Sequence, residues 1–374
     1  MRILINSSKG RFGGAIQVAA SFIEECKYFP EHEYHVLLGP GAGIVIDEKD
    51  FPKNFFFYRL DFGVIGLFNI RRIQKTIREL ELKIKPDIIF SNSGPSYYRS
   101  IAPQINGFNL PLFIYPESPY LSELTAKRKI RFYLKKKIQL YFYKKNCIAI
   151  VTQTNDVNKR VRKLMNTENV FTVTNNHNHF FLKKVKILDR KLPVNDGNIF
   201  RFLTLSAYYP HKNLEIIPQI LKELQSRGIN NVEFVLTLKE KDYQEKIGEN
   251  SSILNVGPIK PQECPALYGE CDALFLPTLA ECFSASYPEA MVMGKPIITT
   301  DLGFAKSICG NAALYFEPKN PKSAADKIIE LVYDAELREY LRSAGFQELK
   351  KFDSPRERAR KYLEICKKYA DNWK

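Results

Sequence analysis

The chain has little of several features that would identify other classes of protein. Its 374 residues contain no run of about 18 uncharged apolar residues, so no segment is expected to span a membrane as a helix. The seven cysteines form no C-x-x-C pair, and their odd number argues against a disulfide framework and favours a reducing compartment. No signal-peptide pattern is recognisable, because residues 1–6 already read as a strand. Neither a Ser-His-Asp order nor an H-E-x-x-H motif is present. We therefore expect a cytoplasmic protein.

What the chain does have is an ordinary globular composition and an unevenly placed positive charge. Hydrophobic residues make up 45% and aromatic residues 13%, which excludes global disorder. The net charge of +15 lies entirely in residues 1–190, which hold 31 Lys and Arg against 16 Asp and Glu, whereas residues 191–374 hold 25 of each. A basic half of this kind attracts phosphate groups, whether of nucleic acid, anionic lipid or an acidic substrate.

Short β-branched runs alternate with longer amphipathic stretches along both halves, a pattern that predicts βα units and parallel sheets. The expected strands fall at residues 2–6, 34–38, 55–58, 87–90, 112–115, 148–152, 200–206, 232–238, 253–256, 273–276, 296–300 and 313–316. The expected helices fall at residues 15–28, 70–82, 214–227, 261–270, 286–293, 321–332, 336–351 and 355–369.

This pattern predicts two Rossmann-like domains joined by the polar stretch 175–198. We expect an N-terminal domain over residues 1–180 and a C-terminal domain over residues 181–354. A last helix, in residues 355–374, would pack back on the first domain. A ligand cleft would lie between the domains, at the carboxyl ends of their strands.

The motif with the most chemistry follows the apolar strand at residues 273–276. Glu281 lies in the loop after this strand, and Glu289 lies eight residues later, inside the next helix. A loop that leads into a helix N-terminus directs backbone N–H groups at an anion, and carboxylates beside it can accept hydrogen bonds from vicinal hydroxyls of a ribose or hexose. Taken alone, paired Glu residues near a helix start are more often surface groups that complement the helix dipole.

The wider sequence around these glutamates resembles family 4 of the glycosyltransferases, in which they form an E-x7-E signature in the C-terminal domain of a GT-B fold. The likeness rests on D-A-L-F-L-P-T at 272–278, G-K-P-I-I at 294–298, S-A-Y-Y-P-H-K-N at 206–213 and G-N-A-A-L-Y-F-E-P at 310–318. Segments 151–154 and 85–89 resemble strand regions of the family's N-terminal sheet. The resemblance implies an α/β GT-B protein, with two Rossmann-like domains whose parallel sheets face each other across a cleft. It also implies that residues 1–180 bind the acceptor and residues 181–354 bind the nucleotide sugar.

The resemblance also implies roles for individual residues. Lys212 would place its ammonium on the donor diphosphate, and the Phe283–Ser284 backbone would face the phosphates. Glu289 would bind the ribose hydroxyls and Glu281 the transferred sugar. The loop that contains Ile259 would border the nucleobase.

Two departures from the family pattern concern the phosphate site. Ala207 stands where an arginine is usual, so His211 or a residue of the other domain would have to supply the second cation. The usual Gly-rich E-G-F-G loop reads E-C-F-S at residues 281–284, which would tighten the approach of the phosphates.

Two loops of the first domain are candidates for the donor and acceptor side of the site. Gly13 and Gly14 end the loop between the first strand and the first helix, where adjacent glycines let a backbone approach a ligand closely. A tight structural turn is the competing interpretation. Glu117, within Y-P-E-S-P at residues 115–119, is the polar acceptor-side candidate.

Residues 127–145 contain nine basic and no acidic residues, interleaved with bulky apolar ones. This composition predicts an interfacial helix on anionic lipid, and the alternative is an ordinary helix with a solvated lysine face. No nucleic-acid-binding module accompanies it, so no nucleic-acid partner is expected. The predicted membrane contacts are Lys129, Arg131, Lys135, Lys136 and Lys137.

The resemblance implies the activity of a retaining hexosyltransferase, which would use a UDP- or GDP-sugar and no metal or other cofactor. The acceptor would be a hydroxyl of a membrane-associated glycan or lipid-linked acceptor, in polysaccharide, lipopolysaccharide or glycolipid synthesis, with the enzyme peripheral on the inner face of the plasma membrane. The alternatives are a GT-B enzyme with a soluble acceptor, a sugar-nucleotide epimerase, and a non-enzymic nucleotide- or nucleic-acid-binding module.

Overall fold

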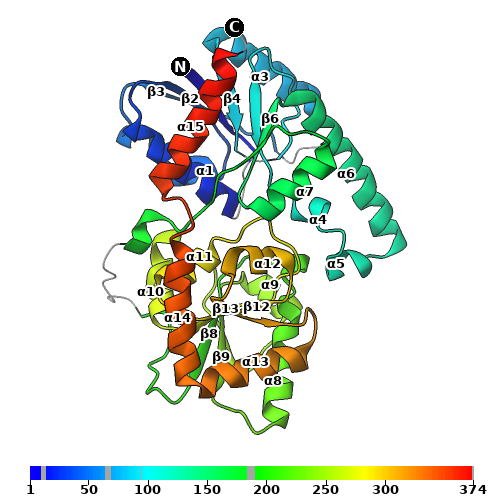
Figure 1. Cartoon of the computed structure of the whole chain (residues 1–374), viewed down its shortest axis with the longest axis vertical. Coiled ribbons are helices and arrows are strands. Elements are labelled where there is room, and N and C mark those ends of the chain that lie inside the picture. Colours follow the sequence, from blue (N-terminus) through cyan, green and yellow to red (C-terminus); the bar gives the residue numbers. More distant parts are fainter. Residues whose placement is uncertain (10–13, 64–68, 93, 183–189, 373–374) are drawn as a thin grey trace. The chain divides into compact units, whose positions relative to one another are not determined.

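The computed structural model describes residues 1–9, 14–63, 69–92, 94–182 and 190–372. The chain forms two compact units, each with its own parallel sheet (Figure 1). Unit 1 consists of Met1–Ile114, Leu124–Asn175 and Asp353–Lys374, and unit 2 of Tyr115–Glu123 and Asn176–Phe352.

The sheet of unit 1 has seven strands in the order β3-β2-β1-β4-β5-β6-β7, and every neighbouring pair is parallel. These strands are β1 (Arg2–Ser7), β2 (Glu33–Leu38), β3 (Phe55–Arg59), β4 (Ile88–Ser91), β5 (Gln104–Gly107), β6 (Ala149–Thr152) and β7 (Val170–Thr172). The order reverses direction at β1, which is the doubly wound arrangement of Rossmann-like folds. The parallel direction of the strands agrees with the βα pattern of the sequence.

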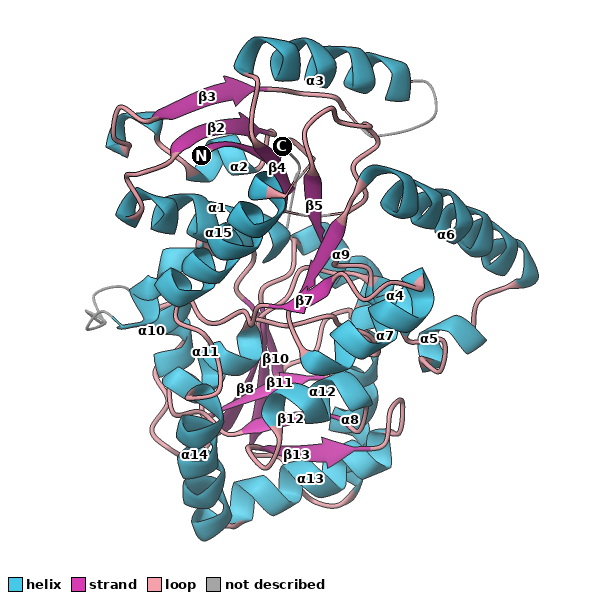
Figure 2. Cartoon of the chain, turned by 45° about the horizontal axis from the view of Figure 1, so that its top comes forward, coloured by secondary structure: helices cyan, strands magenta, loops and turns pink. Residues whose placement is uncertain are grey.

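Helices cover both faces of this sheet (Figures 1 and 2). They are α1 (Gly14–Glu25), α2 (Ala42–Val45), α3 (Ile70–Ile84), α4 (Pro111–Ile114), α6 (Ala126–Asn146), α7 (Asn155–Met165) and α15 (Pro355–Asp371). Successive strand residues point to opposite faces, so Ile3 and Ile5 pack in the core under α1 and α15, and Leu4 packs in the core under α3. Each face is therefore closed by its own apolar layer.

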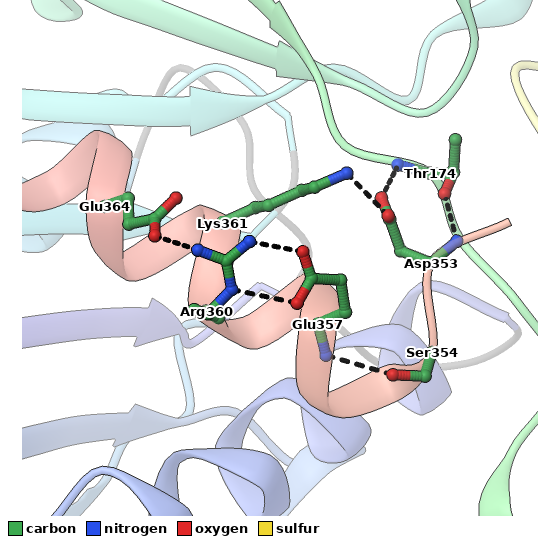
Figure 3. Close-up of polar contacts among 7 residues, drawn as sticks. All are labelled: Thr174, Asp353, Ser354, Glu357, Arg360, Lys361 and Glu364. Atoms are coloured by element: carbon green, nitrogen blue, oxygen red, sulfur yellow. Dashed lines mark hydrogen bonds and ion pairs between the residues drawn. The ribbon is translucent and has the colours of Figure 1, made fainter.

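The C-terminal helix α15 belongs to unit 1, where it packs against α1 and β4. Its start is fastened by a polar network with the segment after β7 (Figure 3). The Asp353 amide donates to Thr174 Oγ1 at 2.6 Å, and the Thr174 amide donates to Asp353 Oδ2 at 3.2 Å. Lys361 Nζ donates to Asp353 Oδ1 at 2.6 Å, and Ser354 caps the helix by accepting from the Glu357 amide at 3.2 Å. Together these contacts fix where the chain re-enters unit 1.

The same figure shows a second set of contacts, along the outer side of α15. Arg360 forms ion pairs with Glu357 and Glu364, one turn before and one turn after it, and its Nε donates to Glu357 Oε2 at 2.8 Å (Figure 3). Such i, i+3 and i, i+4 pairs support an exposed helix by a few tenths of a kcal/mol each.

Unit 2 has a six-stranded parallel sheet in the order β10-β9-β8-β11-β12-β13. These strands are β8 (Phe200–Thr204), β9 (Val232–Leu236), β10 (Ile253–Asn255), β11 (Ala273–Leu276), β12 (Ile297–Thr300) and β13 (Ala313–Phe316). The helices are α5 (Pro119–Ser122), α8 (Ile217–Ser226), α9 (Glu240–Lys246), α10 (Cys264–Gly269), α11 (Ser286–Val292), α12 (Gly303–Cys309), α13 (Pro321–Tyr333) and α14 (Ala335–Leu349). Phe202, Phe234 and Phe275 meet in its core on three neighbouring strands.

One expected strand is wrong. Residues 112–115 were expected to be extended, but Pro111–Ile114 is the single helical turn α4, with Phe113 and Ile114 buried. The strand of this region is β5, whose sequence Gln-Ile-Asn-Gly has one apolar side chain and gives no strand signal. Its Gln104 and Asn106 side chains pair with each other at 2.9 Å, which satisfies part of their buried polar surface.

No helix in the part of the chain that the structure describes is long and apolar enough to cross a membrane.

Candidate functional site

The candidate site lies in unit 2, where β8 and β11, neighbours in the sheet, end and continue into loops. The loop after β8 turns at Pro210–Lys212, a 3-10 helix, and Asn213 closes the turn in the left-handed region, at φ +55°. The loop after β11 runs through Thr278 and Glu281 into α11. Because carboxyl ends of parallel strands share one edge of the sheet, these two loops meet.

The central contact is an ion pair between Lys212 Nζ and Glu281 Oε1, from residues 69 positions apart in the chain. Their side chains are only 15% and 12% exposed, so water screens the pair weakly. Thr278 Oγ1 donates to the same Glu281 oxygen at 3.2 Å. The backbone joins the loops as well, since the Leu279 amide donates to the His211 carbonyl at 2.8 Å. The structure therefore brings Lys212 and Glu281, the residues expected to bind the donor diphosphate and the transferred sugar and to act in catalysis, into direct contact.

Glu289 lies in the first turn of α11 and is partly buried. The Tyr268 hydroxyl, from α10, donates to the carbonyl of Ser286 at 3.1 Å and to Glu289 Oε2 at 3.4 Å. Burial raises the pKa of Glu289 to about 7, and the hydrogen bond from Tyr268 opposes that shift. The Glu289 carboxyl therefore keeps its proton to a higher pH than an ordinary glutamate does.

The predicted phosphate-facing loop is ordered by packing. Phe283 is half-buried, with its ring 5.8 Å from that of Phe352 and nearly perpendicular to it. Ser284 is buried, and its carbonyl accepts from the Tyr287 amide at 3.3 Å.

The loop expected to border the nucleobase follows β10. Ile259 lies half-buried in this loop, where Gly257 adopts φ +74°. That conformation explains a glycine at the turn, because residues with a Cβ rarely adopt it.

The structure bears on the departure at Ala207. His211 precedes Lys212, and its ring lies 5.7 Å from the ring of Tyr209 and 6.2 Å from that of Tyr120. Burial lowers the pKa of His211, the Lys212 charge lowers it further, and Glu281 acts in the opposite direction. His211 is thus held mainly neutral near pH 7, which makes it a poor substitute for the missing arginine.

Of the three loop residues that the sequence proposes in the first domain, Gly13, Gly14 and Glu117, the structure describes two, and these belong to different units. Gly13 lies outside the described residues, and Gly14 is the exposed first residue of α1. Glu117 is exposed, in the segment Tyr115–Glu123 that packs in unit 2. The predicted first domain, residues 1–180, includes this segment, because neighbours in sequence are usually neighbours in the fold.

The basic stretch forms the 21-residue helix α6, capped by Thr125, whose hydroxyl accepts from the Arg128 amide at 3.4 Å. Only Tyr143 and Asn146 of α6 are buried. Arg131, Lys135 and Lys137 are exposed and Lys129 is half-exposed. Lys136 differs: its Nζ donates to the Phe113 carbonyl at 2.7 Å, and partial burial lowers its pKa.

Sequence reasoning assigned no role to Thr278, Tyr268 or Tyr120. Thr278 could have been noticed, since a Pro-Thr pair directly follows the strand before Glu281. Nothing in the sequence marks Tyr268 or Tyr120, because each reaches the site through tertiary packing. Among the described residues, no group of three or more His, Cys, Asp or Glu side chains could hold a metal ion.

Comparison with known proteins gives a consistent result for fold and enzyme class. Residues 185–348 match the family model "Glycosyl transferases group 1". The O-antigen chain mannosyltransferase of Salmonella typhimurium is 26% identical over 60% of this chain and 59% of its own length. Another curated glycosyltransferase, from Methanocaldococcus jannaschii, is 27% identical over 44% of this chain and 47% of its own. The matches thus span between about half and three fifths of these relatives.

Solved structures match over nearly the whole chain. Sucrose-phosphate synthase from Thermosynechococcus elongatus superposes with a TM-score of 0.78, at 13% identity, over 98% of both chains. HepE of Anabaena, solved in complex with UDP-glucose, gives a TM-score of 0.67 at 14% identity, over 97% of this chain and 99% of its own. The protein therefore has the GT-B glycosyltransferase fold, and its curated relatives are glycosyltransferases.

Proposed function

We propose that the protein is a retaining glycosyltransferase that transfers a hexose from a nucleotide diphosphate sugar to a hydroxyl of a membrane-associated glycan or lipid-linked acceptor. The observation that carries this proposal is the contact between Lys212 and Glu281 at the edge of the unit 2 sheet, with Glu289 on the helix that follows. It combines one cation for phosphates with two carboxylates for hydroxyls. The UDP-glucose complex of HepE supports a nucleotide-sugar donor for this fold.

In the proposed complex, Lys212 would bind the diphosphate and Glu281 the hydroxyls of the transferred sugar. These groups now neutralise each other, so a bound donor would replace one buried ion pair by two charge-assisted contacts. The ammonium would stabilise the negative charge that develops on the leaving diphosphate, which is where electrostatic catalysis is most effective. Lys212 would supply this charge without a metal ion.

Glu289 would accept hydrogen bonds from the ribose hydroxyls. Tyr268 holds one oxygen of its carboxyl, which leaves the other for the ligand. The loop with Phe283 and Ser284 would lie along the phosphates, and Ile259 would border the base. An oriented donor of this kind needs little further chemistry from the protein, because positioning and charge stabilisation supply most of the rate enhancement.

The membrane part of the proposal rests on α6. Its exposed apolar side chains Ile130, Leu134 and Ile138 recur at helical spacing and are 62%, 56% and 43% exposed. Tyr133 and Tyr141 lie on the same stretch and are also exposed, and basic residues flank them. Apolar residues bordered by lysines suit the interface of an anionic bilayer, where the protein would be peripheral on the cytoplasmic face.

The deciding experiment is a binding panel of UDP, GDP, UDP-glucose and GDP-mannose, read as shifts in the melting temperature and confirmed by calorimetry. A ligand that binds only the folded state raises the melting temperature. We expect at least one sugar nucleotide to stabilise the wild type, and Lys212→Ala to remove that effect. Lys327→Ala, which removes a lysine from an exposed ion pair with Glu330 on α13, is the matched control. If the whole panel leaves the wild type unshifted, the donor assignment is wrong.

A further inference from the structure

The segment Tyr115–Glu123 lies between α4 and α6 in sequence, two helices of unit 1, and yet packs in unit 2. The Tyr115 ring contacts that of Phe304 at 5.7 Å, edge to face. Glu123, at the other end, forms an ion pair with Lys319. The segment is thus held at both ends, and the residues between them are placed beside the loops of the candidate site.

The central contact of this segment is a buried hydrogen bond. Ser118 Oγ donates to the Leu279 carbonyl at 2.8 Å. Ser118 is 2% exposed and Leu279 is 1% exposed, so water has little access to either group. Loss of a hydrogen-bond donor costs more free energy for a buried carbonyl than for an exposed one, because no solvent molecule replaces the bond.

Leu279 joins this bond to the two loops that carry the candidate catalytic pair. Its carbonyl accepts from Ser118, and its amide donates to the carbonyl of His211, the residue before Lys212. Leu279 also lies two residues before Glu281. The backbone amide and carbonyl of Leu279 therefore hold the Glu281 loop between the Ser118 hydroxyl and the Lys212 loop.

Ser122 provides an internal comparison. Its hydroxyl also donates to a backbone carbonyl, that of Pro119 at 2.7 Å, but this bond is local to α5 and exposed. Two serines of one short segment thus make the same kind of bond, one within its own helical turn and one to the loop before Glu281.

We propose that Ser118 is a positioning residue of the donor site, which fixes the Glu281 loop against Lys212 through the Leu279 carbonyl. The proposal rests on the function proposed above. Without the hydroxyl, the loop shifts to let the Leu279 carbonyl find another donor, and Glu281 moves with it. Glu281 is assigned to the transferred hexose and Glu289 to the ribose of the nucleotide. Loss of the Ser118 hydroxyl should therefore weaken the binding of the sugar nucleotide and leave the binding of the bare nucleotide nearly unchanged.

The test compares Ser118→Ala with Ser122→Ala in the full chain. Dissociation constants are measured by calorimetry for UDP and UDP-glucose, and for GDP and GDP-mannose. We expect Ser118→Ala to weaken the sugar nucleotide about five- to tenfold and the bare nucleotide less than twofold, in line with the loss of one buried hydrogen bond. Ser122→Ala should match the wild type. Equal losses for nucleotide and sugar nucleotide, or no loss, would overturn the positioning role.

Hydrogen exchange of the ligand-free protein separates this proposal from the proposed function. Residues 278–283 should exchange faster in Ser118→Ala than in the wild type, while β8 and β11 keep their protection. If no sugar nucleotide binds the wild type, the proposed function fails, and this measurement still tests the role of Ser118. Unchanged exchange at residues 278–283 would refute it. Ser118→Cys, which nearly keeps the side-chain volume and replaces a strong donor by a weak one, serves if the alanine variant does not fold.

Discussion

The two units present their candidate functional groups in opposite ways. In unit 2, Lys212, Glu281 and Glu289 are largely enclosed and contact other side chains of the unit. In unit 1, the basic and apolar side chains of α6 are exposed over most of the helix length. Enclosed charges are strongly coupled to one another and to a ligand, whereas exposed charges act through a summed field that salt screens. The first arrangement suits a small ligand of defined shape, and the second an extended surface.

This difference also appears in the charge. All of the net charge of +15 lies in residues 1–190, and residues 191–374 are neutral overall. A neutral unit can still bind a diphosphate when one cation is placed correctly, because proximity matters more than the total charge. Net charge therefore indicates where a surface partner binds and says little about where chemistry occurs. The following predictions test this contrast between the units.

The largest effect is expected for Lys212→Ala in unit 2. Under the proposed function, removing the cation assigned to the leaving diphosphate should cost roughly 2–4 kcal/mol of transition-state stabilisation, seen as a fall in kcat. The melting temperature should fall, because removal of Lys212 leaves the enclosed Glu281 carboxylate without its cation, but the variant should remain folded. Steady-state kinetics with the sugar nucleotide that binds will measure the loss. A folded variant with full turnover would contradict the assignment.

The next effect is expected in unit 1, for the triple change of Arg131, Lys135 and Lys137 to Glu. Each cation near an anionic surface contributes about 1 kcal/mol to the free energy of membrane binding. This variant should therefore no longer bind liposomes that contain phosphatidylglycerol. Nucleotide binding should persist. Lys136 is kept, because its ammonium holds the Phe113 carbonyl.

The control for this prediction changes the same net charge elsewhere in unit 1. Arg71, Lys75 and Lys83 are exposed on α3, and their replacement by Glu should leave liposome binding nearly intact. Co-sedimentation at low and high salt compares the three proteins. Equal release of both variants would indicate a non-specific charge effect, and no binding by the wild type would favour a soluble acceptor.

A smaller effect should separate the two glutamates of unit 2. Loss of a hydrogen bond to a charged group costs roughly 1.5–3 kcal/mol. Glu289→Gln should weaken the bare nucleotide diphosphate about tenfold, and Glu281→Gln should weaken only the sugar nucleotide. Calorimetry with both ligands decides. The reverse pattern would require the two roles to be exchanged.

The raised pKa of Glu289 predicts that both stability and nucleotide affinity depend on pH. Its pKa in the folded protein, about 7, exceeds the ordinary value of 4.5, so the folded state binds more protons than the unfolded state between these values. The free energy of unfolding should therefore fall as the pH rises through this window, and nucleotide affinity should rise as the carboxyl ionises. Glu289→Gln should flatten both curves. Chemical denaturation and calorimetry between about pH 5 and pH 8 measure them, and identical curves for both proteins would contradict the assigned burial of this carboxyl.

The smallest effect is expected for Glu81, a buried carboxylate of unit 1 outside any proposed site. It accepts from the amides of Ile101 and Ala102 at 2.8 and 2.7 Å and from the Tyr98 hydroxyl, and so ties α3 to the loop before β5. Glu81→Gln keeps the shape and removes the charge, which should lower the stability of unit 1 by about 1–2 kcal/mol. Hydrogen exchange should rise in unit 1 and stay unchanged in unit 2. A uniform rise would show that the two units unfold together.

Sequence patterns located most of the fold because parallel strands buried on both faces read as continuous apolar runs. The strands of unit 2 and five of the seven in unit 1 fall where these runs predict them. β5 and β7 were not predicted, because Gln-Ile-Asn-Gly has a single apolar side chain and Val-Phe-Thr is only three residues long. The apolar residues 112–115 gave a strand signal and form a helical turn, since a short apolar run suits either state.

The sequence by itself determined the alternation of strands and helices, the placing of Glu281 and Glu289 around a strand–loop–helix junction, and the concentration of charge in the first half. These features depend on neighbours in the chain and on side-chain chemistry. Only the tertiary structure decided that Lys212 meets Glu281, that Tyr268 holds Glu289, that Lys136 is engaged while Lys135 and Lys137 are exposed, and that Ser118 reaches the loop of Glu281. Such contacts join residues that are separated in sequence. Lys212 meets Glu281 because packing places the ends of two strands along one edge of a sheet, and the other contacts form because helices and loops pack against one another.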